Sequence, residues 1–389
     1  MTSLRSGVKL SLMKKFLFLT VLSFFLISTT YAKHQYEEYC FHCFWKYEVK
    51  GSDNYYQFQS DLIQDKYVIK EIKNKKKTGL VSYLLFEDDK IKIDEHDLPS
   101  YIKNNNGILP AHSVGKSLVS YVTGYAICEG YIDNIDVTLD DWSVLKGTLY
   151  EGQKLIDLLN MKAGDQRILG EKYYKSDVRI KDGRYNVNVF PIAQVMKTDI
   201  LQNTKKSKAI YNYSGLATNT IMNYVIFKSG DDFQKILDKV FGEDAKIKNS
   251  VYFQKTLRSD LYLDRKKGEY GRYSFYADRY DYLRIAKAVM DHWNNDTCVG
   301  KYLKTVYERR INKNKNKYKT GAIAYYTRKY GGQFHFDVVG LTKRKILGMG
   351  GAGGQQVIID FDRKRIIVVN SVTRHYNWKK IVYDKLKQK

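Results

Sequence analysis

A serine and a lysine stand three residues apart at the start of a long apolar stretch. Ser113 and Lys116 follow Pro110 and lead into residues 117–128, which are apolar, aromatic or small. Such a stretch after a proline predicts a buried helix, and residues three apart share one face of a helix. We therefore expect the Lys116 amine beside the Ser113 hydroxyl, at the positive end of the helix dipole.

This pair has the chemistry of a self-activating nucleophile. A neutral lysine can take the proton of a serine hydroxyl, and burial or neighbouring positive charge favours the neutral form. The same spacing recurs at four other serines, which are Ser6, Ser11, Ser100 and Ser143. None of these four opens a long apolar helix, so Ser113 is the candidate nucleophile and Lys116 the candidate general base.

Acyl transfer also needs a second proton carrier and two N–H donors for the developing oxyanion. Tyr213 lies in a polar turn just before a second apolar helical stretch and is the candidate carrier, although any one of 34 tyrosines is by default a packing residue. The Ser113 amide is one candidate donor. The other is expected in the glycine-rich residues 348–354, where missing side chains allow close backbone approach; the candidates are Gly350, Gly351, Ala352 and Gly353. A tight turn is the alternative interpretation of these glycines.

The first 32 residues predict export. Lys14 and Lys15 precede the apolar residues 16–27, and small residues lead to an expected cleavage site after Ala32. The apolar run is short for a membrane span, and an uncleaved anchor is the alternative. We expect a periplasmic or secreted protein.

Four cysteines in an exported chain favour disulfides over metal sites. Cys40 and Cys43 are expected to form a local disulfide or structural clip, in preference to a zinc site completed by His42. Cys128 and Cys298 are candidates for a long-range disulfide, with a small buried hydrophobe as the alternative for Cys128. We expect no metal and no cofactor.

The formal net charge is +24. The lysines are spread along the chain, and no zinc-finger spacing, RNA-binding aromatic motif or basic zipper accompanies them. We therefore expect a small-molecule or peptide substrate as partner and no nucleic acid, with membrane contact only through an uncleaved leader.

The order of periodic segments predicts an α+β fold. Strands are expected at residues 47–49, 55–58, 67–72, 80–86 and 91–93, helices within 113–241 and at 280–293, further strands at 355–360 and 365–370, and a final helix from Asn377. Strands at both ends around a helical middle imply one antiparallel sheet built from both chain ends, flanked by helices, with an all-helical lobe.

These motifs together resemble the serine β-lactamase and penicillin-binding-protein superfamily. The similarity is to its class C-related branch of esterases, D-amino-acid peptidases and 6-aminohexanoate-dimer hydrolases. It rests on Ser113-Val114-Gly115-Lys116, Tyr213-Ser214, Leu158-Leu159-Asn160-Met161-Lys162-Ala163-Gly164, Tyr330-Gly331-Gly332-Gln333-Phe334 and the glycine-rich strand before a terminal hairpin and helix.

The resemblance implies a β-lactamase/transpeptidase-like hydrolase domain over residues 80–389, with a helical lobe at about 113–241, after a signal peptide at 1–32 and an extension with the first strands at 33–79. It implies Ser113 as nucleophile, Lys116 as base, Tyr213 as proton shuttle and Ala352 as second oxyanion donor, acting on a small amide, ester or peptide.

Two departures from the superfamily pattern bear on the substrate. Gly215 stands where these β-lactamases carry the Asn of Tyr-x-Asn. Their Lys-Thr-Gly motif has a literal match at residues 319–321, but the position of residues 350–352 next to the terminal hairpin favours that segment as the third motif. The site then lacks the lysine that meets a β-lactam carboxylate, which favours amide or ester hydrolysis over antibiotic hydrolysis.

Two other functions fit the sequence. Residues 111–115 could form a nucleophile elbow with His375 or His335 as base, but residues 104–107 do not have the character of the strand that precedes such an elbow. The chain could also be a family member that binds penicillin-like ligands or peptides with slow or no turnover.

Overall fold

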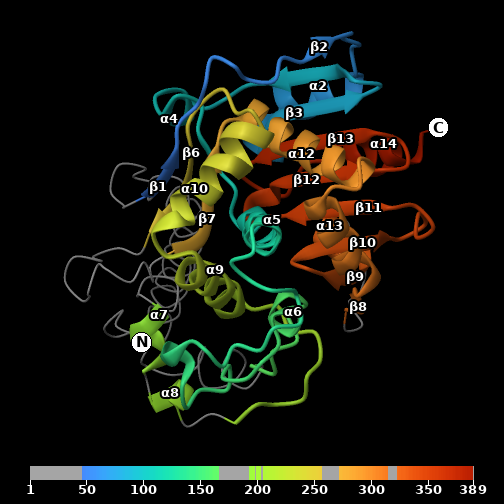
Figure 1. Ribbon diagram of the computed structural model, residues 1–389. Coiled ribbons are helices and arrows are strands. Elements are labelled where there is room, and N and C mark those ends of the chain that lie inside the picture. The colour runs from blue at the N-terminus through green and yellow to red at the C-terminus, as the bar shows by residue number, and fades with distance from the viewer. Residues whose placement is uncertain are drawn as a thin grey trace, which may run out of the picture. The chain divides into compact units, whose positions relative to one another are not determined.

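A nine-stranded sheet joins the two ends of the chain (Figure 1). The computed structural model describes residues 46–165, 192–197, 199–202, 205–255, 271–313 and 322–388. In spatial order the strands are β2 (Gln59–Ser60), β4 (Lys90–His96), β3 (Leu80–Glu87), β13 (Arg365–Ser371), β12 (Gln356–Asp360), β11 (Ile346–Gly350), β10 (Phe334–Val338), β9 (Thr327–Gly331) and β8 (Ile311–Asn312). All pairs are antiparallel except the short pair of β2 with β4. The expected sheet from both chain ends is confirmed.

A second, four-stranded sheet was not expected from the sequence. Its order is β1 (Lys46–Val49), β6 (Val251–Lys255), β7 (Gly271–Ala277) and β5 (Leu109–Pro110). Its strand β5 leads directly to the Ser113 helix, and β7 packs against that helix. The small sheet therefore positions the start of the helix.

The large sheet is covered by helices on both faces. Alternate residues of a strand point to opposite faces, so Leu84 of β3 and its partner Val368 of β13 belong to one apolar core, while Leu85 and Ile367 belong to the other. The first core includes α5 (Val114–Cys128) and α12 (Arg279–Asn294), and the second includes α2 (Lys66–Lys73) and the C-terminal helices. The α+β class is confirmed.

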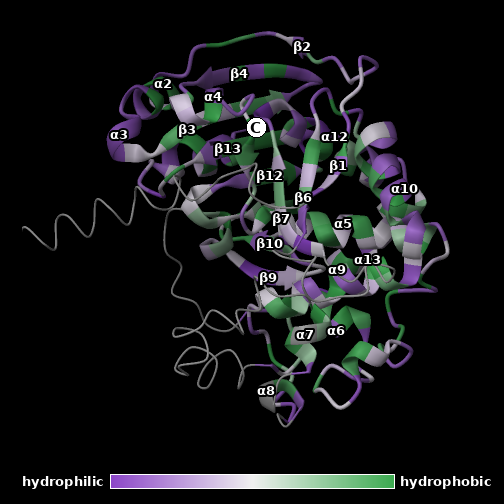
Figure 2. Cartoon of the chain, turned by 90° about the vertical axis from the view of Figure 1, so that its left-hand side faces the viewer, coloured by the Kyte–Doolittle hydropathy of each residue, from purple (hydrophilic) through white to green (hydrophobic). Residues whose placement is uncertain are grey.

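The remaining helices complete these layers and the lobe. They are α3 (Lys75–Thr78), α4 (Ser100–Lys103), η1 (Ser143–Leu145), α6 (Leu155–Leu159), α7 (Ile192–Met196), α8 (Asp199–Gln202), α9 (Gly215–Ser229), η3 (Gly230–Asp232), α10 (Phe233–Leu237), η4 (Asp238–Asp244), α13 (Cys298–Glu308), η6 (Ile323–Tyr325), η7 (Ala352–Gly354), η8 (Lys379–Tyr383) and α14 (Asp384–Lys387). Figure 2 shows the contrast between the hydrophobic α6 and the hydrophilic α3. Among the described residues, no helix is long and apolar enough to cross a membrane.

Two expected strands in the first part of the chain are wrong. Residues 67–72 form most of helix α2, because the Asp65 carboxylate caps it by accepting hydrogen bonds from the amides of Tyr67 (2.9 Å) and Val68 (3.0 Å). Val68 and Ile72, four residues apart, are the buried residues of this helix. Residues 55–58 pair with no strand in the described structure, and the two-residue β2 follows them.

A disulfide ties the end of the Ser113 helix to α13. It joins Cys128 to Cys298, with 5.9 Å between their Cα atoms and 170 residues between them in sequence. Of the two alternatives for Cys128, the structure therefore has the disulfide. Cys40, Cys43 and the leader lie outside the described residues.

Candidate active site

Ser113 stands at the N-terminal end of α5, after a sharp turn. The residue before it, His112, has φ +49°, and the Val114 amide donates to the Ala111 carbonyl at 3.1 Å. The Ser113 side chain makes no capping hydrogen bond to its own helix. Its hydroxyl is therefore available to a neighbouring group.

Lys116 is the only lysine of the three described Ser-x-x-Lys pairs that is buried. It is 2% exposed, whereas the lysines that follow Ser100 and Ser143 are exposed on short helical turns. The Ser-x-x-Lys spacing is common in the sequence. Burial of the lysine distinguishes the Ser113 pair from the other two pairs that the structure describes.

Two tyrosine rings lie close to the Lys116 amine. Its Nζ lies 3.2 Å from the centroid of the Tyr273 ring and 5.2 Å from that of Tyr213. Within the described ranges no carboxylate forms an ion pair with Lys116. Its immediate surroundings are therefore aromatic, and the faces of aromatic rings attract a cation.

Tyr213 contacts both members of the pair. A hydrogen bond joins its hydroxyl to that of Ser113. Burial raises the pKa of the Tyr213 phenol, while the Lys116 charge and the Ser113 hydrogen bond act to lower the same pKa. Tyr213 is nevertheless 42% exposed; its ring lines a pocket, and the hydroxyl is the enclosed end that meets Ser113.

The turn that carries Tyr213 rests on the segment at residues 158–164. Met161, at φ +55°, accepts a 2.8 Å hydrogen bond from the Asn212 amide through its carbonyl. Ser214 then caps α9 by accepting from the Ala217 amide at 3.0 Å. Behind it, the buried Asp165 accepts a 2.8 Å hydrogen bond from Tyr150, and a further hydrogen bond joins Asp165 to Ser214. These contacts fix the direction in which Tyr213 points.

The glycine-rich segment lies against the turn before Ser113. A Cβ atom on Gly351 would lie 2.5 Å from the Ala111 carbonyl oxygen and 3.2 Å from the His112 Cβ, so only glycine allows this approach. The next residue is Ala352. Neither the Ser113 amide nor the Ala352 amide donates a hydrogen bond within the part of the chain that the structure describes.

A pocket of about 410 Å³ opens over these groups. Its lining residues are Ser113, Tyr211, Asn212, Tyr213, Ala322, Ala324, Tyr325, His335, Gly350, Gly351, Ala352 and Arg374. The structure thus brings together the candidate nucleophile, the candidate shuttle and three of the four candidate backbone donors; Gly353 is not among the lining residues. The alternative motif at residues 319–321 lies outside the described residues.

Neither histidine of the elbow hypothesis forms a described hydrogen bond with Ser113. His375 is exposed and does not line the pocket. His335 lines the pocket, where its ring packs edge-on against Tyr330 at 4.9 Å. Burial lowers the pKa of His335, and no hydrogen bond joins it to Ser113 among the described residues. Ser113 is hydrogen-bonded to Tyr213. The geometry therefore fits a site built on Lys116 and Tyr213 better than one with a histidine base.

Tyr273 is the site residue that sequence reasoning missed. It lies on β7, 157 residues after Lys116, within one of several tyrosine-containing strands. Alternation along a strand gives the face on which a side chain lies but not the helix it meets. No signal in the sequence alone distinguished Tyr273 from the other tyrosines.

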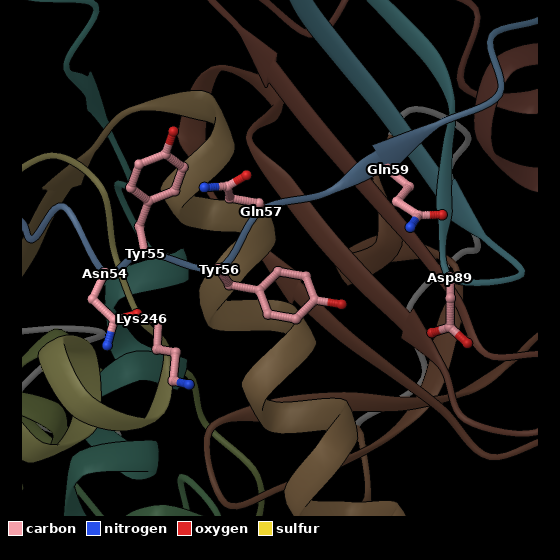
Figure 3. A pocket seen from close by; sticks show the side chains of 7 residues that line it. All are labelled: Asn54, Tyr55, Tyr56, Gln57, Gln59, Asp89 and Lys246. Carbon is pink, nitrogen blue, oxygen red and sulfur yellow. The ribbon is translucent and has the colours of Figure 1, made fainter.

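A second hollow lies elsewhere on the chain (Figure 3). It measures about 490 Å³, and all its lining side chains are polar: Asn54, Tyr55, Tyr56, Gln57, Gln59, Asp89 and Lys246. It shares no residue with the Ser113 pocket and contains no candidate nucleophile paired with a buried base. We therefore place the candidate active site at Ser113.

Neither known protein families nor curated proteins match this sequence. Solved structures do match the fold. A 6-aminohexanoate-dimer hydrolase of Bacillus anthracis aligns with 89% of this chain and 92% of its own, at a TM-score of 0.62 and 13% identity. A penicillin-binding protein of Bacillus halodurans aligns with 84% of this chain and 100% of its own (TM-score 0.58, 13% identity).

A D-stereospecific amidohydrolase of a Streptomyces species aligns with 83% of this chain and 98% of its own, at a TM-score of 0.56 and 13% identity. Identities this low carry information on the fold alone. The resemblance drawn from the sequence motifs is confirmed at that level. The chain has the β-lactamase/transpeptidase-like fold of the serine β-lactamase and penicillin-binding-protein superfamily.

Proposed function

We propose that this protein is a serine hydrolase that forms an acyl enzyme on Ser113, with a small amide, ester or peptide as substrate. The observation that carries the proposal is the hydrogen bond between Ser113 and Tyr213 beside the buried Lys116, at the floor of one pocket. A nucleophile, a base and a second proton carrier then lie within reach of one bound substrate.

Each residue of the site has its own role in the proposed reaction. Lys116 takes the Ser113 proton as Oγ bonds to the acyl carbon, and the amides of Ser113 and Ala352 stabilise the oxyanion. As the bond to the leaving group breaks, Tyr213 passes the proton from Lys116 to that group. Water then attacks the acyl enzyme by the reverse route and releases the acid.

The pocket lining supports a substrate smaller than a folded protein. Its volume of about 410 Å³ is in the usual range for small-molecule sites. The names of the structural neighbours, which include an amidohydrolase and the hydrolase EstCE1 with promiscuous acyltransferase activity, support amide and ester bonds as the first to test. No described lining residue is a lysine, but the Arg374 guanidinium lines the pocket and can bind a substrate carboxylate.

Export to the periplasm or beyond is part of the proposal. The disulfide between Cys128 and Cys298 supports it, because disulfides persist in oxidising compartments. The partners we propose are the substrate alone, without nucleic acid.

The test is labelling of the folded protein, without residues 1–32, by a fluorophosphonate probe. We expect one adduct, mapped to Ser113, and its loss in Ser113→Ala. Ser143→Ala is the matched control, because Ser143 has the same spacing to a lysine but both side chains are exposed. A folded protein without an adduct would overturn the proposal.

Turnover is tested next, with short-chain nitrophenyl esters and amides beside a chromogenic cephalosporin. Multiple turnovers lost in Lys116→Ala but kept in His375→Ala would support hydrolysis with a lysine base. The opposite pattern would favour the histidine elbow, and a single stoichiometric acylation would favour a binding protein.

A further inference from the structure

Lys116 is buried against aromatic rings, and among the described residues no carboxylate forms an ion pair with it. Its amine is closest to Tyr273, at 3.2 Å from the ring centroid. Tyr273 does not line the pocket, so it contacts the base and not the substrate. This separation makes its role testable apart from substrate binding.

The backbone holds Tyr273 in this place. A Cβ atom on Gly115 would lie 1.8 Å from the Tyr273 carbonyl oxygen and 3.3 Å from the Phe275 amide nitrogen. Strand β7 therefore lies directly on the first turn of α5, and only a glycine at position 115 permits that contact. The residue next to the base fixes the distance between the base and Tyr273.

Helix α9 also holds this strand, through hydrogen bonds from two of its side chains. The Asn219 side chain accepts a 3.3 Å hydrogen bond from the Tyr273 amide. One turn later, Asn223 accepts from the Gly271 amide at 2.9 Å and donates to the Gly271 carbonyl at 2.8 Å. Since Tyr213 lies just before α9, one helix positions both tyrosines that flank Lys116.

Lys116 interacts electrostatically with both Tyr273 and Tyr213. The Lys116 charge lowers the pKa of Tyr273 against the effect of burial, and a hydrogen bond with Lys116 and the Arg272 charge add to the decrease. Burial raises the pKa of Tyr213, and Tyr273 and Tyr211 add to the increase, whereas the Lys116 charge lowers this pKa. Besides burial and the effect of Tyr273 on Tyr213, the groups that act on the two phenols are Lys116, Ser113, Arg272 and Tyr211.

We propose that Tyr273 is a positioning residue that holds the Lys116 amine over its ring and stabilises the ammonium formed when Ser113 gives up its proton. The proposal rests on the proposed hydrolase function. The proton leaves Ser113 Oγ, binds Lys116 Nζ and moves on through Tyr213 to the leaving group, so a Lys116 ammonium forms on the way to the acyl enzyme. The negative face of an aromatic ring attracts a cation most strongly in a desolvated site, and stabilisation confined to the transition state accelerates the reaction.

The variants are Tyr273→Phe, which keeps the ring, and Tyr273→Leu, which removes it. We expect Tyr273→Leu to lower kcat on a nitrophenyl ester by roughly tenfold to thirtyfold, with KM nearly unchanged. Without the ring the ammonium is less stable, so the acid limb of the pH–rate profile moves to lower pH. Tyr273→Phe should retain most of kcat and the wild-type profile.

The control for structural damage is Phe275→Leu, which removes a buried ring from the same strand that does not touch Lys116. It should lower the melting temperature but leave kcat and the pH profile of the folded protein unchanged. If Tyr273→Leu had the wild-type kcat and profile, or if Phe275→Leu changed both in the same way, the proposal would be wrong.

NMR of protein with isotope-labelled lysine tests the same contact without activity. The Lys116 signal is assigned by its absence in Lys116→Met, and its titration is compared in wild type and Tyr273→Leu. A lower midpoint in the variant supports the contact even if the fluorophosphonate probe fails to label Ser113, which would overturn only the hydrolase function. An unchanged midpoint overturns the role of Tyr273.

Discussion

The Ser117 hydroxyl donates a 2.7 Å hydrogen bond to the carbonyl of Gln333, 216 residues further along the chain. Gln333 also donates from its side chain to the carbonyls of Leu158 and Leu159, at 3.1 and 3.0 Å, and accepts from the Thr218 hydroxyl at 2.8 Å. This glutamine thus connects the nucleophile helix, α6, α9 and the large sheet.

The first prediction is that Gln333→Ala lowers the free energy of unfolding by about 3 kcal/mol, because it removes three buried side-chain hydrogen bonds of about 1 kcal/mol each. Gln333 has φ +68°, a backbone strain that alanine shares, so the loss reports the hydrogen bonds. Gln333→Asn is too short to replace the bonds but tolerates that φ, so it shows their loss with the strain relieved. Urea unfolding measures both variants, and Gln388→Ala, at an exposed position, is the control.

Tyr213→Phe is expected to slow acylation of Ser113 by roughly 100-fold or more, the usual range for loss of a general acid or base. The change removes only the hydroxyl that meets Ser113 and keeps the ring over Lys116. The rate of fluorophosphonate labelling measures it. Tyr325→Phe, in the same pocket but bonded to Arg374, is the matched control, and equal slowing in both variants would exclude the proton-shuttle role.

Much of the large sheet could be predicted because its signal is local. Residues 80–86 and 365–370 are apolar strands on both faces, and the structure pairs them as β3 and β13. The helix after Ser113 was equally clear, since its residues are apolar on all sides and almost all are buried. Burial of a whole element leaves a pattern that needs no knowledge of its partners.

The contacts of the site are harder to predict because they depend on partners far apart in sequence. Tyr273 lies against Lys116 only because Gly115 allows β7 to contact α5. No feature of the sequence near residue 273 indicates this contact. The error at residues 67–72 could have been avoided, because a residue nearby in the sequence indicates a helix. Asp65, three residues before Val68, was an N-cap signal that outweighs the β-branched character of the segment.

Removal of the disulfide by Cys128→Ser with Cys298→Ser is expected to lower the free energy of unfolding by about 5 kcal/mol. The bond closes a loop of 170 residues, and a longer loop gains more from closure in the chain-entropy model. Guanidinium unfolding of the oxidised wild type and the double variant measures the difference. A loss below about 1 kcal/mol would show that the reduced chain retains these contacts when unfolded.

The half-buried His112 is expected to make stability sensitive to acid. Burial lowers its pKa to about 4, and the Arg374 charge acts in the same direction. The unfolded chain, with an ordinary pKa near 6.5, therefore binds a proton that the folded protein does not, and stability is lost as pH falls from about 6.5 to 4. His112→Asn, which tolerates the positive φ, should reduce this loss, as measured by melting temperature at each pH; the exposed His375→Asn should not.

The last prediction concerns the second oxyanion donor. Gly351→Ala places a Cβ 2.5 Å from the Ala111 carbonyl oxygen, so the glycine-rich segment must move away from the Ser113 turn. The Ala352 amide then moves with it, and loss of one oxyanion donor costs roughly 100-fold in kcat. Gly350→Ala is the neighbouring control, because the two atoms nearest its Cβ would be side-chain atoms of Ile323 and Ala324, at 3.3 and 3.4 Å, with no contact under 3.0 Å. If ester hydrolysis fell equally in both variants, a general loosening of the strand would explain the loss, and Ala352 would no longer be the donor.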